Sequence, residues 1–126
     1  MKTNISLSII GIYNTFVAIM MMFFTKDLIG AIVNSDNPEV LRMCEIMHYG
    51  LSPAILIIGL MLLLSRNTST ENAKNLLLAY VIGTLVLMYV FFGIMANESL
   101  MNFSLASLTP DIAMLALAIF GYLKAK

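Results

Sequence analysis

Four apolar blocks separated by polar connections dominate this sequence of 126 residues. A helix of about 20 apolar residues, rising 1.5 Å per residue, spans the ~30 Å hydrocarbon core of a bilayer. With 60% hydrophobic and 11% charged residues, the chain has too little polar surface to cover a soluble core. In lipid every backbone polar group must be satisfied internally, which favours helices. We therefore predict an all-α integral membrane four-helix bundle forming one domain over residues 1–126, with helices near 5–24, 38–65, 75–95 and 99–123.

The first block, from Ile5 to Phe24, also resembles the apolar part of a signal peptide, because Lys2 precedes it. Its length and the absence of a small-x-small cleavage site after Phe24 favour a retained helix. The connection that follows contains a short apolar run, residues 28–33, which is too short to span. We expect this run to lie against the membrane surface.

The second block begins with a strong helix-start signal, Asn37-Pro38-Glu39. Asn accepts hydrogen bonds from first-turn N–H groups, Pro suits the first helical position, and an acid complements the positive helix end. The helix is expected to end at Ser65-Arg66-Asn67, and Pro53 is expected to kink it. Before the third block, Ser69 or Thr70 can cap a helical lead-in. Within that block, Gly83 and Gly93 offer positions where a neighbouring helix could approach closely.

The fourth apolar block has two possible structural interpretations. Thr109-Pro110-Asp111 repeats the start signal, but only about 14 residues follow before the polar C-terminus, which is short for a span. Either the helix begins near Ser99 and kinks at Pro110, or residues 100–108 form a re-entrant or interfacial piece. We favour the helix that begins near Ser99.

The distribution of charged residues predicts the orientation. Four crossings place both termini and the middle connection on one side, and positive residues near helix ends mark the cytoplasmic face. That side carries Lys2, Arg66, Lys74, Lys124 and Lys126, whereas the other carries Lys26 and Arg42 with Asp27, Asp36, Glu39, Glu45 and Glu98. We predict a multi-pass protein of the cell inner (cytoplasmic) membrane, with both termini cytoplasmic.

Several function classes are disfavoured by composition and missing motifs. The seven basic residues balance the seven acidic ones, so no nucleic-acid partner is expected. Cys44 is the single cysteine, which excludes an internal disulfide and a paired-thiol redox centre. The eleven methionines are explained by packing between helices. No phosphate-binding loop or hydrolase motif occurs, and we assign no catalytic residue and no cofactor.

The most informative polar residues lie on the second predicted helix. Spacings of three and four place Arg42, Glu45 and Tyr49, and likewise Glu45 and His48, on one stripe. Helical rise places this stripe at a depth close to that of Asp111 on the last helix. Placing an ionisable group inside a membrane costs free energy, and such groups are often functional. We therefore predict one outward-facing polar pocket as the candidate ligand site, lined by Arg42, Glu45, His48, Tyr49, Asp111, Tyr13, Asn14 and Tyr89.

Each of these residues also has a structural explanation. Arg42 can neutralise Glu45, Asp111 can balance a helix start, and Tyr13 and Asn14 can bond a neighbouring helix. Glu45 and His48 have the spacing of the Glu-x-x-His pair of di-metal bundles. His48 is the chain's single histidine, however, and a second such pair is lacking, so no metal site is predicted.

The overall layout resembles the small bacterial DoxX-like four-helix membrane proteins. The resemblance rests on the acid-containing first outer connection, on Val40-Leu41-Arg42 leading to Gly50, and on the end of the second helix in Leu-Leu-Leu-Ser-Arg at 62–66. It covers about a third of the chain and implies a four-helix fold. Activity in that group is mostly unassigned, so the resemblance implies no site residue.

Two functions are compatible with these features, and an enzyme is a less favoured third. The first is a non-enzymatic helical module or accessory subunit, which associates with itself or with a larger membrane complex. The second is a binder or carrier of a small or lipidic molecule, which would use the outward polar pocket. Short loops and the lack of a complete catalytic set favour the first function. Glu45 and Asp111 facing one another in the bundle would favour the second.

Overall fold

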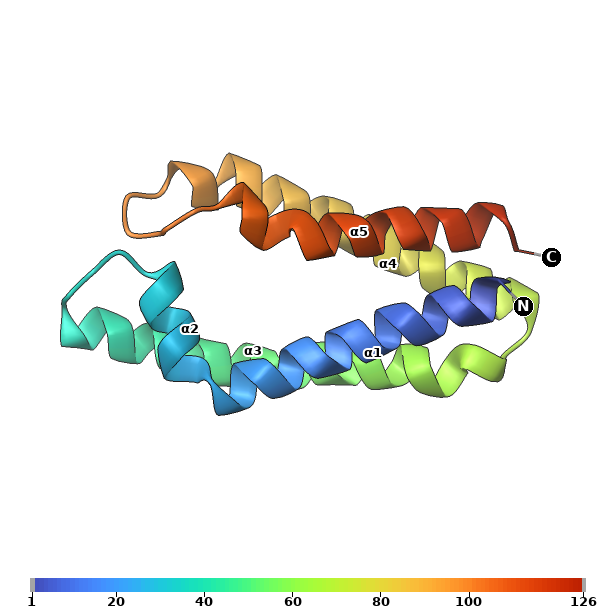
Figure 1. The fold of residues 1–126 in the computed structure, drawn as a ribbon, viewed down its shortest axis with the longest axis horizontal. Helices are drawn as coiled ribbons and strands as arrows, with labels where there is room; N and C mark the ends of the chain where they lie inside the picture. The colour runs from blue at the N-terminus through green and yellow to red at the C-terminus, as the bar shows by residue number, and fades with distance from the viewer. Residues whose placement is uncertain (1, 126) are drawn as a thin grey trace.

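The computed structural model describes residues 2–125, and its regular elements in this range are all helices, apart from one isolated bridge between two connections (Figure 1). Four helices are long and apolar enough to cross a membrane, so the all-α class and the number of candidate spans are confirmed. The α-helices are α1 (Lys2–Phe23), α2 (Thr25–Ile32), α3 (Pro38–Leu64), α4 (Thr70–Gly93) and α5 (Leu105–Leu123), with 3-10 turns η1 (Ser65–Asn67) and η2 (Met95–Asn97).

The long helices form two pairs, α1 with α3 and α4 with α5 (Figure 1). Both termini and the connection between α3 and α4 lie at one end of the bundle, and α2 lies at the other. Helix α1 packs against both α4 and α5, whereas α3 packs chiefly against α1 and α2. The two pairs are therefore held together mainly through α1.

Helix starts follow the local sequence signals. Asn37 accepts a hydrogen bond through its side chain from the Glu39 backbone N–H at 2.9 Å, and Pro38 occupies the first turn of α3. The Ser69 hydroxyl accepts from the Asn72 N–H at 3.4 Å. The predicted caps of both helices are confirmed, and the lead-in to α4 is continuous with the span.

Pro53 lies inside α3, where it supplies no N–H to the Tyr49 carbonyl one turn earlier. The Ser52 hydroxyl donates to this same carbonyl at 3.2 Å. The chain thus replaces the lost backbone bond with a side-chain bond next to the proline. The kink at Pro53 stays a prediction.

The last helix begins later than predicted. Helix α5 starts at Leu105, and Pro110 lies inside it, so neither a start near Ser99 nor a start at Pro110 is correct. The preceding residues are extended, and an isolated antiparallel bridge joins Met101 to Val33. Their backbone groups bond a segment 65 or more residues away instead of completing a helical turn. The other short apolar run became helix α2, which packs on α3.

Close helix contacts occur at glycines other than the two predicted. A Cβ at Gly59 of α3 would lie 2.6 Å from the Thr15 backbone nitrogen of α1, and one at Gly11 would lie 2.9 Å from the Leu63 nitrogen. These glycines let the two backbones approach, as in small-xxx-small helix pairs. A Cβ at Gly83 would meet no atom of a neighbouring element within 4 Å, and the three atoms nearest to a Cβ at Gly93 belong to Tyr89 of the same helix. The close-approach prediction for Gly83 and Gly93 is therefore not met within this chain.

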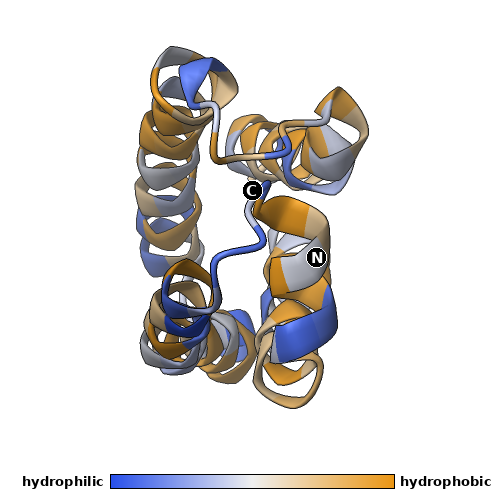
Figure 2. Ribbon diagram, turned by 90° about the vertical axis from the view of Figure 1, so that its left-hand side faces the viewer, coloured by the Kyte–Doolittle hydropathy of each residue, from blue (hydrophilic) through white to orange (hydrophobic). Residues whose placement is uncertain are grey.

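The buried core is small and lies toward the end that carries the termini. Most of the remaining apolar surface is exposed, and hydrophobic residues lie around the helices on all sides (Figure 2). The exposed fraction reaches 78% for Phe23 and 83% for Leu64. Such a surface suits lipid better than water. The core cluster consists of Leu7, Ile10, Leu62, Ala73, Leu77 and Ala118.

Candidate functional site

Arg42 and Glu45 form an ion pair along α3. The Arg42 guanidinium lies 2.9 Å from the Glu45 carboxylate, and the two side chains are 64% and 15% exposed. The spacing of three residues predicted this contact. Because the arginine is largely exposed and both partners belong to one helix, the pair acts first as a local neutralisation.

Asp111 finds its partner on α1. The Tyr13 hydroxyl donates a hydrogen bond to the Asp111 carboxylate at 2.9 Å. Next along α1, the Asn14 amide donates to the Ile10 carbonyl at 2.9 Å and to the Tyr80 hydroxyl at 3.3 Å. Residues from α1, α4 and α5 thus form one polar layer inside the bundle.

The structure therefore divides the predicted polar pocket. Asp111 joins Tyr13, and Arg42 joins Glu45, whereas no described hydrogen bond joins Asp111 to His48. Tyr49 and Tyr89 are 46% and 70% exposed. Among the predicted ligand residues, His48 alone lines the large pocket described next. A binding role for the others stays a prediction.

A large apolar pocket lies where α3 and the α4–α5 pair diverge. Its volume is about 860 Å³, within the range of pockets that hold drug-sized ligands. No carboxylate, Lys or Arg is among the described residues that line it. We call it the wedge pocket. Its walls are Ile29, Ile32, Val33, Cys44, Met47, His48, Gly50, Leu51, Ala54, Phe91, Met95, Met101, Asn102, Phe103, Ser104 and Ser107.

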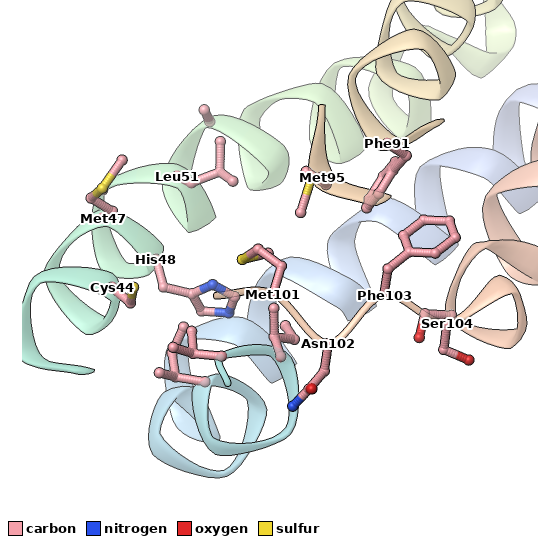
Figure 3. Close-up of a pocket in the computed structure, with 16 residues that line it drawn as sticks. Cys44, Met47, His48, Leu51, Phe91, Met95, Met101, Asn102, Phe103 and Ser104 are labelled. Carbon is pink, nitrogen blue, oxygen red and sulfur yellow. The ribbon is translucent and has the colours of Figure 1, made fainter. Parts of the chain in front are cut away.

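The extended segment before α5 supplies one wall of the wedge pocket. Figure 3 shows Phe103 beside Phe91, and their ring centroids are 6.5 Å apart. Phe103 also meets Phe92 edge-on at 5.8 Å. These contacts attach the segment to the end of α4. Residues 101–104 of this segment all line the pocket.

His48 is one of the few polar side chains in the pocket lining, together with Asn102, Ser104 and Ser107. Its imidazole extends from α3 into the pocket region (Figure 3). The Nε2 atom is shielded from solvent and has no hydrogen-bond partner. An unsatisfied polar atom in an apolar wall is costly. His48 is therefore the described lining residue with a buried, unused hydrogen-bonding atom.

Sequence reasoning missed the wedge pocket because its walls come from separate segments. The Phe91, Met95 and Phe103 side chains meet only after α4 ends and the chain crosses back. One usable signal was the mixed composition of residues 99–108, apolar but interrupted by Asn and Ser. The i, i+4 spacing of Cys44 and His48 also placed both on the wall-forming face of α3.

The arrangement suits binding rather than a defined reaction. Among residues 2–125, no group of three or more His, Cys, Asp or Glu side chains is placed to hold a metal ion. The described lining instead offers thioethers, aromatic rings and aliphatic chains around one imidazole.

Comparisons with known proteins found no match: no protein-family model, curated protein or solved structure corresponds to this chain.

Proposed function

We propose that this chain is a membrane protein that binds an elongated amphipathic molecule of lipid type in the wedge pocket, as a non-enzymatic binder or carrier. The observation that supports the proposal is the pocket itself: about 860 Å³, apolar, and placed between candidate membrane spans. Ligand pockets are mostly apolar with a few polar groups that orient the ligand. Here His48 is the side chain suited to that role.

The proposal differs from the polar pocket predicted from the sequence, because Glu45 bonds Arg42 and Asp111 bonds Tyr13 instead of facing one another. Its support comes from the apolar wedge pocket instead.

The ligand would be recognised by shape and apolar contact along Leu51, Phe91 and Phe103, with one polar interaction at His48. A ligand with several charges is disfavoured, because the described lining provides no Lys or Arg to compensate its desolvation. Fatty acids, prenyl chains and sterol-like molecules fit this description.

Gly50 offers a direct test of the wedge pocket. It lines the pocket, and a Cβ added there meets nothing within 4 Å. Gly50→Leu should fill pocket volume without disturbing α3. The probe is a diazirine-bearing long-chain fatty acid in phospholipid nanodiscs, and mass spectrometry locates the labelled residues. We expect saturable labelling at Leu51 and Phe103, reduced at least tenfold in Gly50→Leu.

Gly83→Leu is the matched control. It adds the same side chain to a helical glycine with open surroundings, on α4 and outside the pocket. It should label as the parent protein does. Labelling at Leu51 that never saturates, or that Gly50→Leu leaves unchanged, would contradict the proposed function.

A second candidate function is the helical module or accessory subunit. The observation that favours it is the outer face of α4, where Gly83 has open space and the neighbouring Ile82 and Val86 are 56% and 59% exposed. A second helix could pack closely at such a position. If Gly83→Leu changes the size of the complex extracted in mild detergent, while pocket labelling stays normal, association through α4 is supported.

A further inference from the structure

The two helix pairs are joined differently at the two ends of the bundle. At the end that carries the termini, the core cluster packs Leu7 of α1 with Leu77 of α4 and Ala118 of α5. At the other end, the wedge pocket separates α3 from α4 and α5. There the connection is made largely by two crossing segments, residues 32–34 and 100–102, which we call the clasp.

Hydrogen bonds close the clasp on both sides of the Val33–Met101 bridge. The Asn34 N–H donates to the Leu100 carbonyl at 2.8 Å, and the Asn102 N–H donates to the Ile32 carbonyl at 2.7 Å. Two side-chain amides add to them: Asn34 bonds the Ser99 carbonyl at 3.2 Å and Asn102 bonds the Ala31 carbonyl at 3.4 Å. Opening the clasp would break all four bonds together.

Between α3 and α4, no described hydrogen bond closes the wedge pocket as the clasp does at the end of the bundle. Leu51 and Ala54 of α3 line one wall, and Phe91 at the end of α4 lines the facing wall. Helix α3 packs mainly on α1 and α2 rather than on α4 or α5. Both walls belong to candidate membrane spans, Pro38–Asn67 and Thr70–Asn97. A bundle placed in a bilayer would therefore present this gap to the acyl chains of lipids.

We propose that the occupant of the wedge pocket is an amphiphile drawn from the bilayer, which passes sideways between α3 and α4 while the clasp stays closed. This inference rests on the proposed function and adds the source of the ligand and its route. Sideways passage displaces only apolar contacts, whereas passage through the clasp breaks backbone hydrogen bonds. Once inside, the acyl chain lies along Leu51 and Phe91, and the polar head lies toward His48.

The bridge geometry allows the clasp to be locked. Val33 and Met101 form the non-hydrogen-bonded pair of an antiparallel bridge, because the bonds run from their flanking residues. Such pairs have Cα atoms about 4.5 Å apart, within the ~4.4–6.8 Å range of disulfides. Val33→Cys with Met101→Cys, in a Cys44→Ser background that removes the native thiol, should form a disulfide on mild oxidation.

The experiment compares photolabelling before and after oxidation. The double-cysteine protein is placed in nanodiscs preloaded with the diazirine fatty acid, and labelling at Leu51 and Phe103 is quantified. We expect the oxidised protein to retain saturable labelling within about twofold of the reduced protein. Val33→Cys alone, in the same background and treated with the same oxidant, is the matched control for damage by oxidation. A short-chain, water-soluble diazirine acid tests the aqueous route in parallel.

The outcomes separate the two proposals. Saturable labelling that is lost at least tenfold on oxidation would overturn the sideways route alone and show that the clasp must open. Labelling by the water-soluble acid in place of the long-chain one would overturn the bilayer source. Failure of the disulfide to form would show that the clasp is not closed, and would overturn the route as well. Val33, Cys44 and Met101 themselves line the wedge pocket, so the proposed function is judged on the parent protein: absence of saturable labelling there would overturn the proposed function and this inference together.

Discussion

The absence of a Cβ atom at glycine allows the backbones of α1 and α3 to approach closely. At Gly59 the missing Cβ leaves room for Thr15, whose hydroxyl and backbone nitrogen occupy the space where the added carbon would lie. The Thr15 hydroxyl is itself buried and has no hydrogen-bond partner. The crossing therefore depends on close packing at this point rather than on a polar contact.

Replacing Gly59 with alanine should destabilise the protein, although the same change usually stabilises a helix interior. The new Cβ would lie 2.6 Å from the Thr15 backbone nitrogen, and overpacking of this kind costs about 1–3 kcal/mol. Unfolding of the purified protein by sodium dodecyl sulfate in mixed micelles measures the difference. Gly83→Ala, with no atom within 4 Å, is the control and should be neutral or stabilising. Equal stability of the two variants would contradict the close crossing.

Some contacts between individual residues could be predicted from the sequence, and others could not. The Arg42–Glu45 pair was predictable, because both residues belong to one helix and their spacing fixes the contact. The partner of Asp111 was not, because it depends on how α1 and α5 are rotated toward each other. Tyr13 and Asp111 were both selected as candidates, but their mutual bond could not be inferred from their depths alone.

At the scale of elements, the helix limits fall into two groups. Those set by three or four neighbouring residues, such as the cap at Asn37, were predicted from the sequence. The start of α5 at Leu105 was not. Residues 100–102 bond the chain near Val33, and a partner so distant in sequence leaves no local signal. The clasp and the wedge pocket were missed for this same reason.

The Ser52 hydroxyl should stabilise the folded protein only while Pro53 is present. In the parent protein, Ser52→Ala removes the bond to the Tyr49 carbonyl, with an expected loss of about 0.5–1.5 kcal/mol. In a Pro53→Ala background, the new backbone N–H can bond the same carbonyl, so Ser52→Ala should then cost little. A double-mutant cycle on the free energy of unfolding measures the coupling. A cost for Ser52→Ala that is the same in both backgrounds would refute this role of the hydroxyl.

At the scale of the whole molecule, the described termini lie at one end of the bundle, together with the connection from α3 to α4 (Figure 1). This arrangement agrees with an even number of crossings. Among the positive residues predicted to be cytoplasmic, Arg66, Lys74 and Lys124 lie at this end, where α1 also begins at Lys2, and Lys126 lies outside the described residues. The clasp and α2 lie at the other end. The side of the membrane to which each end belongs stays a prediction from the charges.

Thiol labelling tests this orientation. In a Cys44→Ser background, a membrane-impermeant maleimide added to intact cells should modify Ser35→Cys, which lies between α2 and α3. It should spare Asn67→Cys until the membrane is made permeable, because positive residues favour the cytoplasmic side. The reverse pattern would invert the orientation. Modification of both positions in intact cells would contradict the four-crossing arrangement.

The tight crossing of α1 and α3 also has a consequence for biosynthesis. Both helices, with Gly11 and Gly59 at their contact, lie in the first 64 residues of the chain. A ribosome releases the N-terminal part first, so this pair is complete before α5 has been translated. The later helices then meet a surface that is already assembled. The order of synthesis thus favours a first helical pair that serves as the template on which the rest of the protein docks.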